Sequence, residues 1–173
     1  MPTTPTTLSL MTLCLLAAGC CTERCATGTN GAVDFAHVSI TAIQAMQEQA
    51  ESIKAHGAAL VAWVPGEATT GWESRMRVVG TFHSNDQDPA NDANLLAIAY
   101  TKAAEMADTL KNSGSGVRPK LKGENGYKGG VIRPVAGGYV IAAFSGAKSE
   151  DDVVISGKGA DVLVAAYGAP VAK

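Results

Sequence analysis

The sequence predicts a mixed α/β (α+β) domain in which helices pack against a central antiparallel sheet. Two apolar segments flank the Gly137-Gly138 pair, which suits a hairpin turn because glycine adopts positive φ without penalty. The second segment, 139–144, is continuously apolar, as in a strand that is covered on both faces. Acidic residues after Ser149, a predicted N-cap, then open a helix. A hairpin that leads into a helix docked on its own sheet is an α+β arrangement.

Length and composition favour one domain with an ample core. The chain has 173 residues, 46% of them apolar and only 5% aromatic, so small residues fill much of the core and allow the backbone to approach closely. The net charge of −2, from 14 basic and 16 acidic residues, provides no electrostatic footprint for nucleic acid.

The N-terminal stretch differs from the rest of the chain. It contains no charge as far as Cys21, and its short apolar run ends in small residues before Cys20, which resembles the lipobox of bacterial lipoproteins. We predict a lipoprotein-type signal peptide over 1–20, lipidation at Cys20, and export to the bacterial cell envelope as a periplasmic or outer-membrane lipoprotein. A frayed hydrophobic N-terminus is the alternative. Residues 21–37 form a flexible tether, in which Cys21 and Cys25 either pair or stay free.

Periodicity predicts the next three elements. Apolar residues recur at helical spacing from Val38, with Ser39 as a possible N-cap and His56 at the end of the helix. A buried strand follows over 58–64. After a loop, clean alternation over 72–83 predicts a half-buried strand.

Boundary signals define the remaining elements. Asp88, as an N-cap before a proline, begins a second helix that runs to about Lys111. Residues 114–129 form a long loop without apolar periodicity, of a kind that is often functional. After the hairpin, the last helix covers 150–167, and Gly157 within it indicates a close approach to the sheet or to another subunit. The predicted order is α-β-β-α-loop-β-β-α.

Short glycine and serine motifs mark the carboxyl-terminal block. They occur in chain order at Gly129, Gly130, Gly138, Ser145 and Gly146. An acidic helix start follows them, and an alanine-rich helix around Lys102 precedes them. This pattern resembles the GlcG/HbpS-like family of small haem-binding domains, also called the haem-degrading domain family. The resemblance spans 38–167 and leaves 168–173 as a tail. It implies a profilin-like fold, assembly into a homo-oligomer, and haem or a related tetrapyrrole as the ligand.

Five residues are candidate ligand contacts for such a domain. His83 shares a predicted strand face with Arg75 and Arg77, so its imidazole would ligate haem iron while the arginines pair with propionates. A solvent-exposed histidine on an edge strand is the alternative. Lys102 either faces the ligand cleft or is a solvated surface residue. Tyr127 would ligate iron or cap the pocket.

Other charged groups have simpler interpretations. The long loop carries a basic set that either holds an anionic part of the ligand or is merely solvated: Arg118, Lys120, Lys122 and Lys128. Glu150, Asp151 and Asp152 complement the positive end of the last helix. The sequence contains no nucleophile elbow, zinc-protease motif, phosphate-binding loop or dinucleotide fingerprint.

These observations predict an exported, membrane-anchored protein that binds a small ligand for capture, buffering or sensing, with haem as the suspected cofactor. Its expected partners are that ligand, the membrane through a lipid anchor, and further copies of the chain, but no nucleic acid. Two alternatives stay open: an enzyme that degrades haem or acts on another small molecule, and a structural oligomeric envelope lipoprotein.

Overall fold

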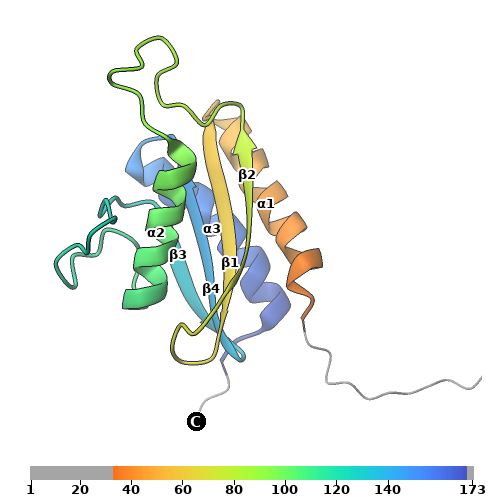
Figure 1. Cartoon of the computed structure of the whole chain (residues 1–173). Helices are drawn as coiled ribbons and strands as arrows, with labels where there is room; N and C mark the ends of the chain where they lie inside the picture. Colours follow the sequence, from red (N-terminus) through yellow and green to blue (C-terminus); the bar gives the residue numbers. More distant parts are fainter. Residues whose placement is uncertain (1–32, 171–173) are drawn as a thin grey trace, which may run out of the picture. The chain divides into compact units, whose positions relative to one another are not determined.

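An antiparallel sheet lies between two layers of helices in the computed structural model, which describes residues 33–170 (Figure 1). The elements follow in the order α1 (Phe35–Ser52), β1 (Gly57–Pro65), β2 (Glu73–Val79), α2 (Leu95–Thr109), β3 (Gly130–Val135), β4 (Gly138–Ser145) and α3 (Ser149–Tyr167). The strand order is β2-β1-β4-β3, and each neighbouring pair is antiparallel. The predicted α+β class and element order are confirmed.

The two central strands, β1 and β4, are apolar on both faces because helices cover both sides of the sheet. Their register places large residues opposite small ones, as in the pairs Ala59↔Phe144 and Leu60↔Ala143. This alternation lets the helices approach the sheet closely without leaving voids.

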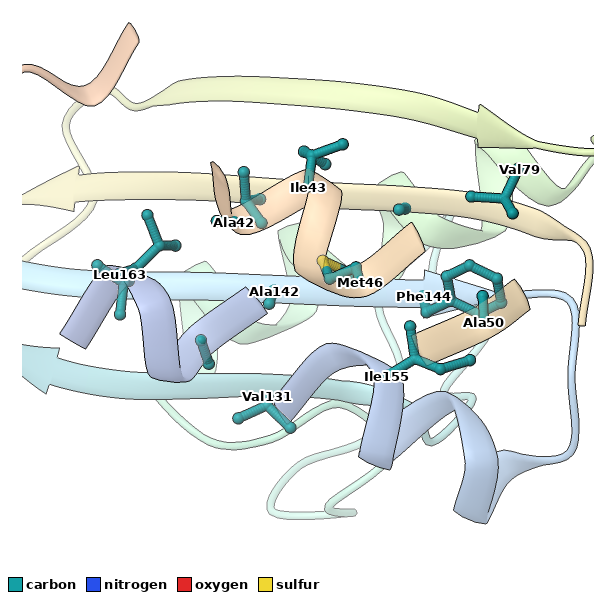
Figure 2. Packing of buried hydrophobic residues seen from close by; sticks show 14 of the residues in the cluster. Ala42, Ile43, Met46, Ala50, Val79, Val131, Ala142, Phe144, Ile155 and Leu163 are labelled. Atoms are coloured by element: carbon teal, nitrogen blue, oxygen red, sulfur yellow. The ribbon is translucent and has the colours of Figure 1, made fainter. Parts of the chain in front are cut away.

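Each face of the sheet has its own core cluster. The helices α1 and α3 cover one face, where Met46, Phe144 and Ile155 meet in the interior (Figure 2). The helix α2 alone covers the other face, where Met106 packs against a cluster that includes Leu60. The alternate residues of each central strand therefore point into different clusters, as the two-residue period of a strand requires.

Two strand boundaries differ from the prediction. The hairpin pairs Val135 with Gly138, so its turn is Ala136 and Gly137 rather than the two glycines. The strand β2 ends at Val79 because Gly80 adopts a φ of +71°, which turns the chain out of the sheet. His83 therefore lies in a loop, and the predicted strand over 72–83 is wrong beyond Val79.

The helix starts also differ from the prediction. The N-cap of α1 is Asp34, whose carboxylate accepts from the Ala36 N–H, so α1 begins inside the predicted tether. Ser39 is instead fully buried within the helix. The N-cap of α2 is Asn94, and Asp88 closes a turn by accepting from the Ala90 N–H. In both helices the polar residue immediately before the first helical residue supplies the cap.

The helix α3 is capped at Lys148 without a side-chain hydrogen bond, so Ser149 is not its N-cap. Its close approach to the sheet occurs at Gly159, where an added Cβ would lie 2.5 Å from the Met46 sulfur. Gly157 has open space around its Cα, so the predicted close approach to the sheet does not occur there, and the alternative of a contact with another subunit stays a prediction.

The predicted signal peptide, the Cys20 lipidation site and the Cys21/Cys25 pair lie outside the described residues. Within residues 33–170, no helix combines the length and the apolar character needed to cross a membrane.

The two glycines of α3 predict opposite responses to alanine. Gly157→Ala should stabilise the fold by about 0.5–1 kcal/mol, because alanine is the better helix former and meets nothing there. Gly159→Ala should destabilise it by about 1–3 kcal/mol, because buried Met46 must move. Urea denaturation of both variants measures the difference, and equal stabilisation by the two would contradict this packing.

Candidate functional site

A cleft of about 270 Å³ opens where the first half of α2 meets the connection from β4 to α3. We call it the α2–α3 cleft and define it by its lining: Ser84, Ala93, Leu95, Ile98, Lys102, Tyr127, Lys128, Ser145, Gly146, Ala147, Ser149 and Asp152. Two predicted ligand residues, Lys102 and Tyr127, therefore line one cleft.

A buried ion pair forms the polar part of this cleft. The Lys102 Nζ donates to Asp152 Oδ2 at 2.8 Å and to the Phe144 carbonyl at 2.7 Å. The second carboxylate oxygen of Asp152 accepts from the Ala147 N–H at 3.0 Å. Only 3% of the Lys102 side chain and 5% of the Asp152 side chain are exposed. Lys102 is therefore not a solvated surface lysine, and capping does not account fully for Asp152.

Ser156 of α3 joins the end of β4 to the backbone just before β3. Its hydroxyl accepts from the Phe144 N–H at 2.8 Å and donates to the Gly129 carbonyl at 2.6 Å. Gly129 has a φ of +126°, and a Cβ there would lie 2.6 Å from Lys102 Nζ. The first glycine of the Gly129-Gly130 motif thus lets the backbone pass directly over the ion pair.

Burial disfavours the charged form of both Lys102 and Asp152. Burial lowers the pKa of the Lys102 ammonium, and the negative charge of Asp152 opposes this shift. Burial likewise raises the pKa of the Asp152 carboxyl, and the Lys102 charge opposes it. Because each charge has hydrogen bonds to the partner and to the backbone, the geometry fits the ionised pair.

The sequence held a signal for this pair that the prediction missed. Lys102 falls on the apolar stripe of α2, three residues after Ala99 and four before Met106. Asp152 similarly precedes buried Ile155 and Ser156 on α3. A lysine and an aspartate on the buried faces of two helices are best satisfied by each other.

His83 lies in the loop between β2 and α2, where Asp92 holds it. Its Nδ1 contacts Asp92 Oδ2, while the other Asp92 oxygen accepts from the Ser84 hydroxyl and the Asn85 N–H. The hydrogen bond to Asp92 is the main cause that raises the pKa of His83, and the same contact lowers the pKa of Asp92. With Nδ1 engaged, Nε2 remains for a ligand.

This loop also contains the one group of residues in the described chain that suits a metal ion. Ligand atoms of His83, Asp86 and Asp92 lie within 4.8 Å of one another. The hydrogen bonds to both oxygens of Asp92 already account for its position. These hydrogen bonds tie the two ends of the loop together at Asp92, whereas Asp86 only approaches His83, at 3.9 Å.

Arg75 and Arg77 do not join His83. Arg75 Nε donates to the buried Ser39 hydroxyl at 2.8 Å, and Arg77 donates to Gln47 at 2.8 Å. Both arginines thus bind α1 on the opposite side of the sheet from α2. The predicted strand face shared with His83 does not form, because β2 ends four residues before that histidine.

The long loop is held by its own arginine. The Arg118 guanidinium donates to Asp108 through Nε at 2.8 Å and to both carboxylate oxygens of Glu124 at 2.7 Å. These bonds raise the pKa of Arg118 and lower the pKa of Glu124 to about 2. Arg118 is therefore structural, whereas Lys128 lines the α2–α3 cleft.

Comparison with known proteins gives no relative. No model of a known protein family matches the chain, and a search of curated proteins finds no match.

Removing one partner of the buried ion pair should be costly. Lys102→Met leaves the Asp152 carboxylate uncompensated and should lower the free energy of unfolding by about 3–5 kcal/mol. Lys102→Met combined with Asp152→Asn should recover most of this loss, since no charge remains buried. Chemical denaturation measures both variants against Lys158→Met, which removes an exposed lysine. A double variant as unstable as Lys102→Met would contradict the pairing.

The His83–Asp92 contact predicts a specific titration. The folded pKa of His83 lies above 6.5 and that of Asp92 lies below 3.8, so this contact stabilises the fold fully between those two pH values and loses its effect as pH rises through the raised His83 pKa. Asp92→Asn should move the His83 pKa down, as followed by NMR of the ring protons. The His56 signal, from outside this loop, is the internal control. An unmoved His83 pKa would show that Asp92 does not hold the imidazole.

Proposed function

We propose that this chain is an exported, membrane-tethered and oligomeric ligand-binding protein of the GlcG/HbpS-like type. Its ligand is haem or a related tetrapyrrole, bound for capture, buffering or sensing. The observation that carries the proposal is the α2–α3 cleft, where Lys102 and Tyr127 meet next to the loop that holds His83. The resemblance over 38–167 supplies the class of the ligand.

The cleft suits an anionic group. An ammonium has three N–H donors, and Lys102 uses two of them on described residues, at Phe144 and Asp152. We propose that the third donor binds a ligand oxygen, since Lys102 lines the cleft. Lys128 adds a second positive charge to the lining, and the hydroxyls of Ser145 and Ser149 add neutral hydrogen-bonding groups. Because Asp152 balances the charge of Lys102, the lining has a net charge of +1, and a carboxylate would find that charge and several donors there.

The same residues fit one edge of a tetrapyrrole. The cleft volume of about 270 Å³ lies just below the range of about 300–1,000 Å³ that is typical of pockets for drug-sized ligands. The cleft would therefore hold the carboxylate edge of the macrocycle and leave the remainder at its rim. His83 belongs to the loop at this rim, with Nδ1 held by Asp92 and Nε2 able to ligate iron. Arg75 and Arg77 are not part of this site.

A hemin titration of the purified full-length chain tests the proposal. The Soret band should shift and saturate at equimolar hemin, and His83→Ala should abolish or alter the bound spectrum because the imidazole ligand is lost. The matched control is His56→Ala, which removes an exposed ring that makes no hydrogen bond with residues 33–170. A Soret band that never saturates would contradict haem binding.

The same sample separates binding from catalysis. The bound spectrum should persist when a reductant and oxygen are added, as expected for capture or buffering. Bleaching of the Soret band with release of a linear tetrapyrrole would favour the haem-degrading enzyme instead.

A further inference from the structure

The loop between α2 and β3 exposes large apolar side chains. Val117 and Leu121 are 57% and 55% exposed, the highest values among large apolar residues in the described chain, and Tyr127 is 53% exposed. In Figure 1 this loop projects beside α2, away from α1. Three large exposed apolar side chains therefore lie within residues 117–127, where contact with water is unfavourable.

This exposure is built into the fold. Arg118 fastens the segment to Asp108 on α2 and to Glu124 within the loop, and Asn125 donates to the Thr101 hydroxyl at 3.1 Å. The loop is thus fastened at two points to α2. Its apolar side chains remain outside the core because these polar contacts hold the backbone in place.

The loop is also strongly basic in an acidic chain. Residues 108–128 contain five basic and two acidic residues and thus have a net charge of +3. The whole chain has a net charge of −2, so the remaining residues together have a net charge of −5. Arg118 occupies both acidic groups of this segment. The Lys111 and Lys122 side chains make no hydrogen bond or ion pair with residues 33–170. The charges of these two lysines are therefore available to an external partner, whereas Lys120 donates to the Asn125 carbonyl and Lys128 lines the α2–α3 cleft.

We propose that the α2–β3 loop is a second membrane contact, which docks on an anionic lipid bilayer. Val117 and Leu121 would enter the boundary between headgroups and acyl chains, with Tyr127 at headgroup level and the lysines beside lipid phosphates. A bilayer fits better than a protein partner, because protein interfaces are depleted of lysine. Stable attachment usually takes an acyl anchor and a polybasic patch together. The inference rests on the proposed lipid anchor, and because Tyr127 and Lys128 also line the α2–α3 cleft, its test uses other residues of the loop.

Hydrogen exchange on vesicles tests the loop directly. The full-length chain is bound to vesicles of phosphatidylcholine alone or mixed with phosphatidylglycerol, so that any N-terminal anchoring is common to both samples. Amide exchange over 115–127 should slow on the anionic vesicles only. The acidic loop over 80–94 should exchange equally on both and is the internal control.

Two variants separate the apolar and the charged contributions. Val117→Ser with Leu121→Ser should abolish the protection, whereas Ile40→Ser with Val154→Ser, at exposed positions on α1 and α3, should keep it. Lys111→Glu with Lys122→Glu should weaken the contact by at least about fivefold per lysine. Lys54→Glu with Lys158→Glu is the charge-matched control. Equal exchange on the two vesicle types, or protection that survives the serine variant, overturns the inference.

Discussion

The ion pair between Lys102 and Asp152 is the interaction on which the arrangement of the site depends. It joins α2 to α3, and through the Phe144 carbonyl it fixes both helices to the end of β4. Among the described residues, it is the only ion pair whose two side chains are almost fully buried. The backbone at Gly129 follows the same constraint, because only a residue without a side chain fits against the ammonium.

Such a pair is a poor source of net stability. The cost of removing two charges from water offsets most of their attraction, and well-packed apolar residues of the same volume would do as well or better. Its position at the wall of an open cleft offers another reason for its presence. A lysine already held by a carboxylate and a carbonyl is preorganised, so a ligand need not order it. The same ion pair therefore holds α2 and α3 together and forms part of the proposed ligand site.

The sequence predicted the elements whose signals are local. Continuous apolar runs predicted both central strands, and the Gly137-Gly138 pair predicted the hairpin with its turn displaced by one residue. The predicted helix starts were wrong because several polar residues near each start were plausible caps. Only the tertiary context selects Asp34 over Ser39. Local patterns place Lys102 and Asp152 each on the buried face of a helix, but they do not specify that these two residues, 50 positions apart, are partners. Similarly, β2 ends at Val79 and not at His83 as predicted, so His83 does not share a strand face with Arg75.

The strand order has a consequence for how the chain folds. The strand β1 lies between β2 and β4. Of the residue pairs that join β1 to β4, Pro65 and Gly138 are the closest in sequence, and even they are 73 positions apart. The strands β1 and β4 cannot pair until residues 66–137 have been synthesised and β4 has reached β1. Contacts between such distant segments slow folding, since the entropy of a large loop is lost before the contacts form. The middle of the sheet in the nascent chain therefore stays open until late in synthesis.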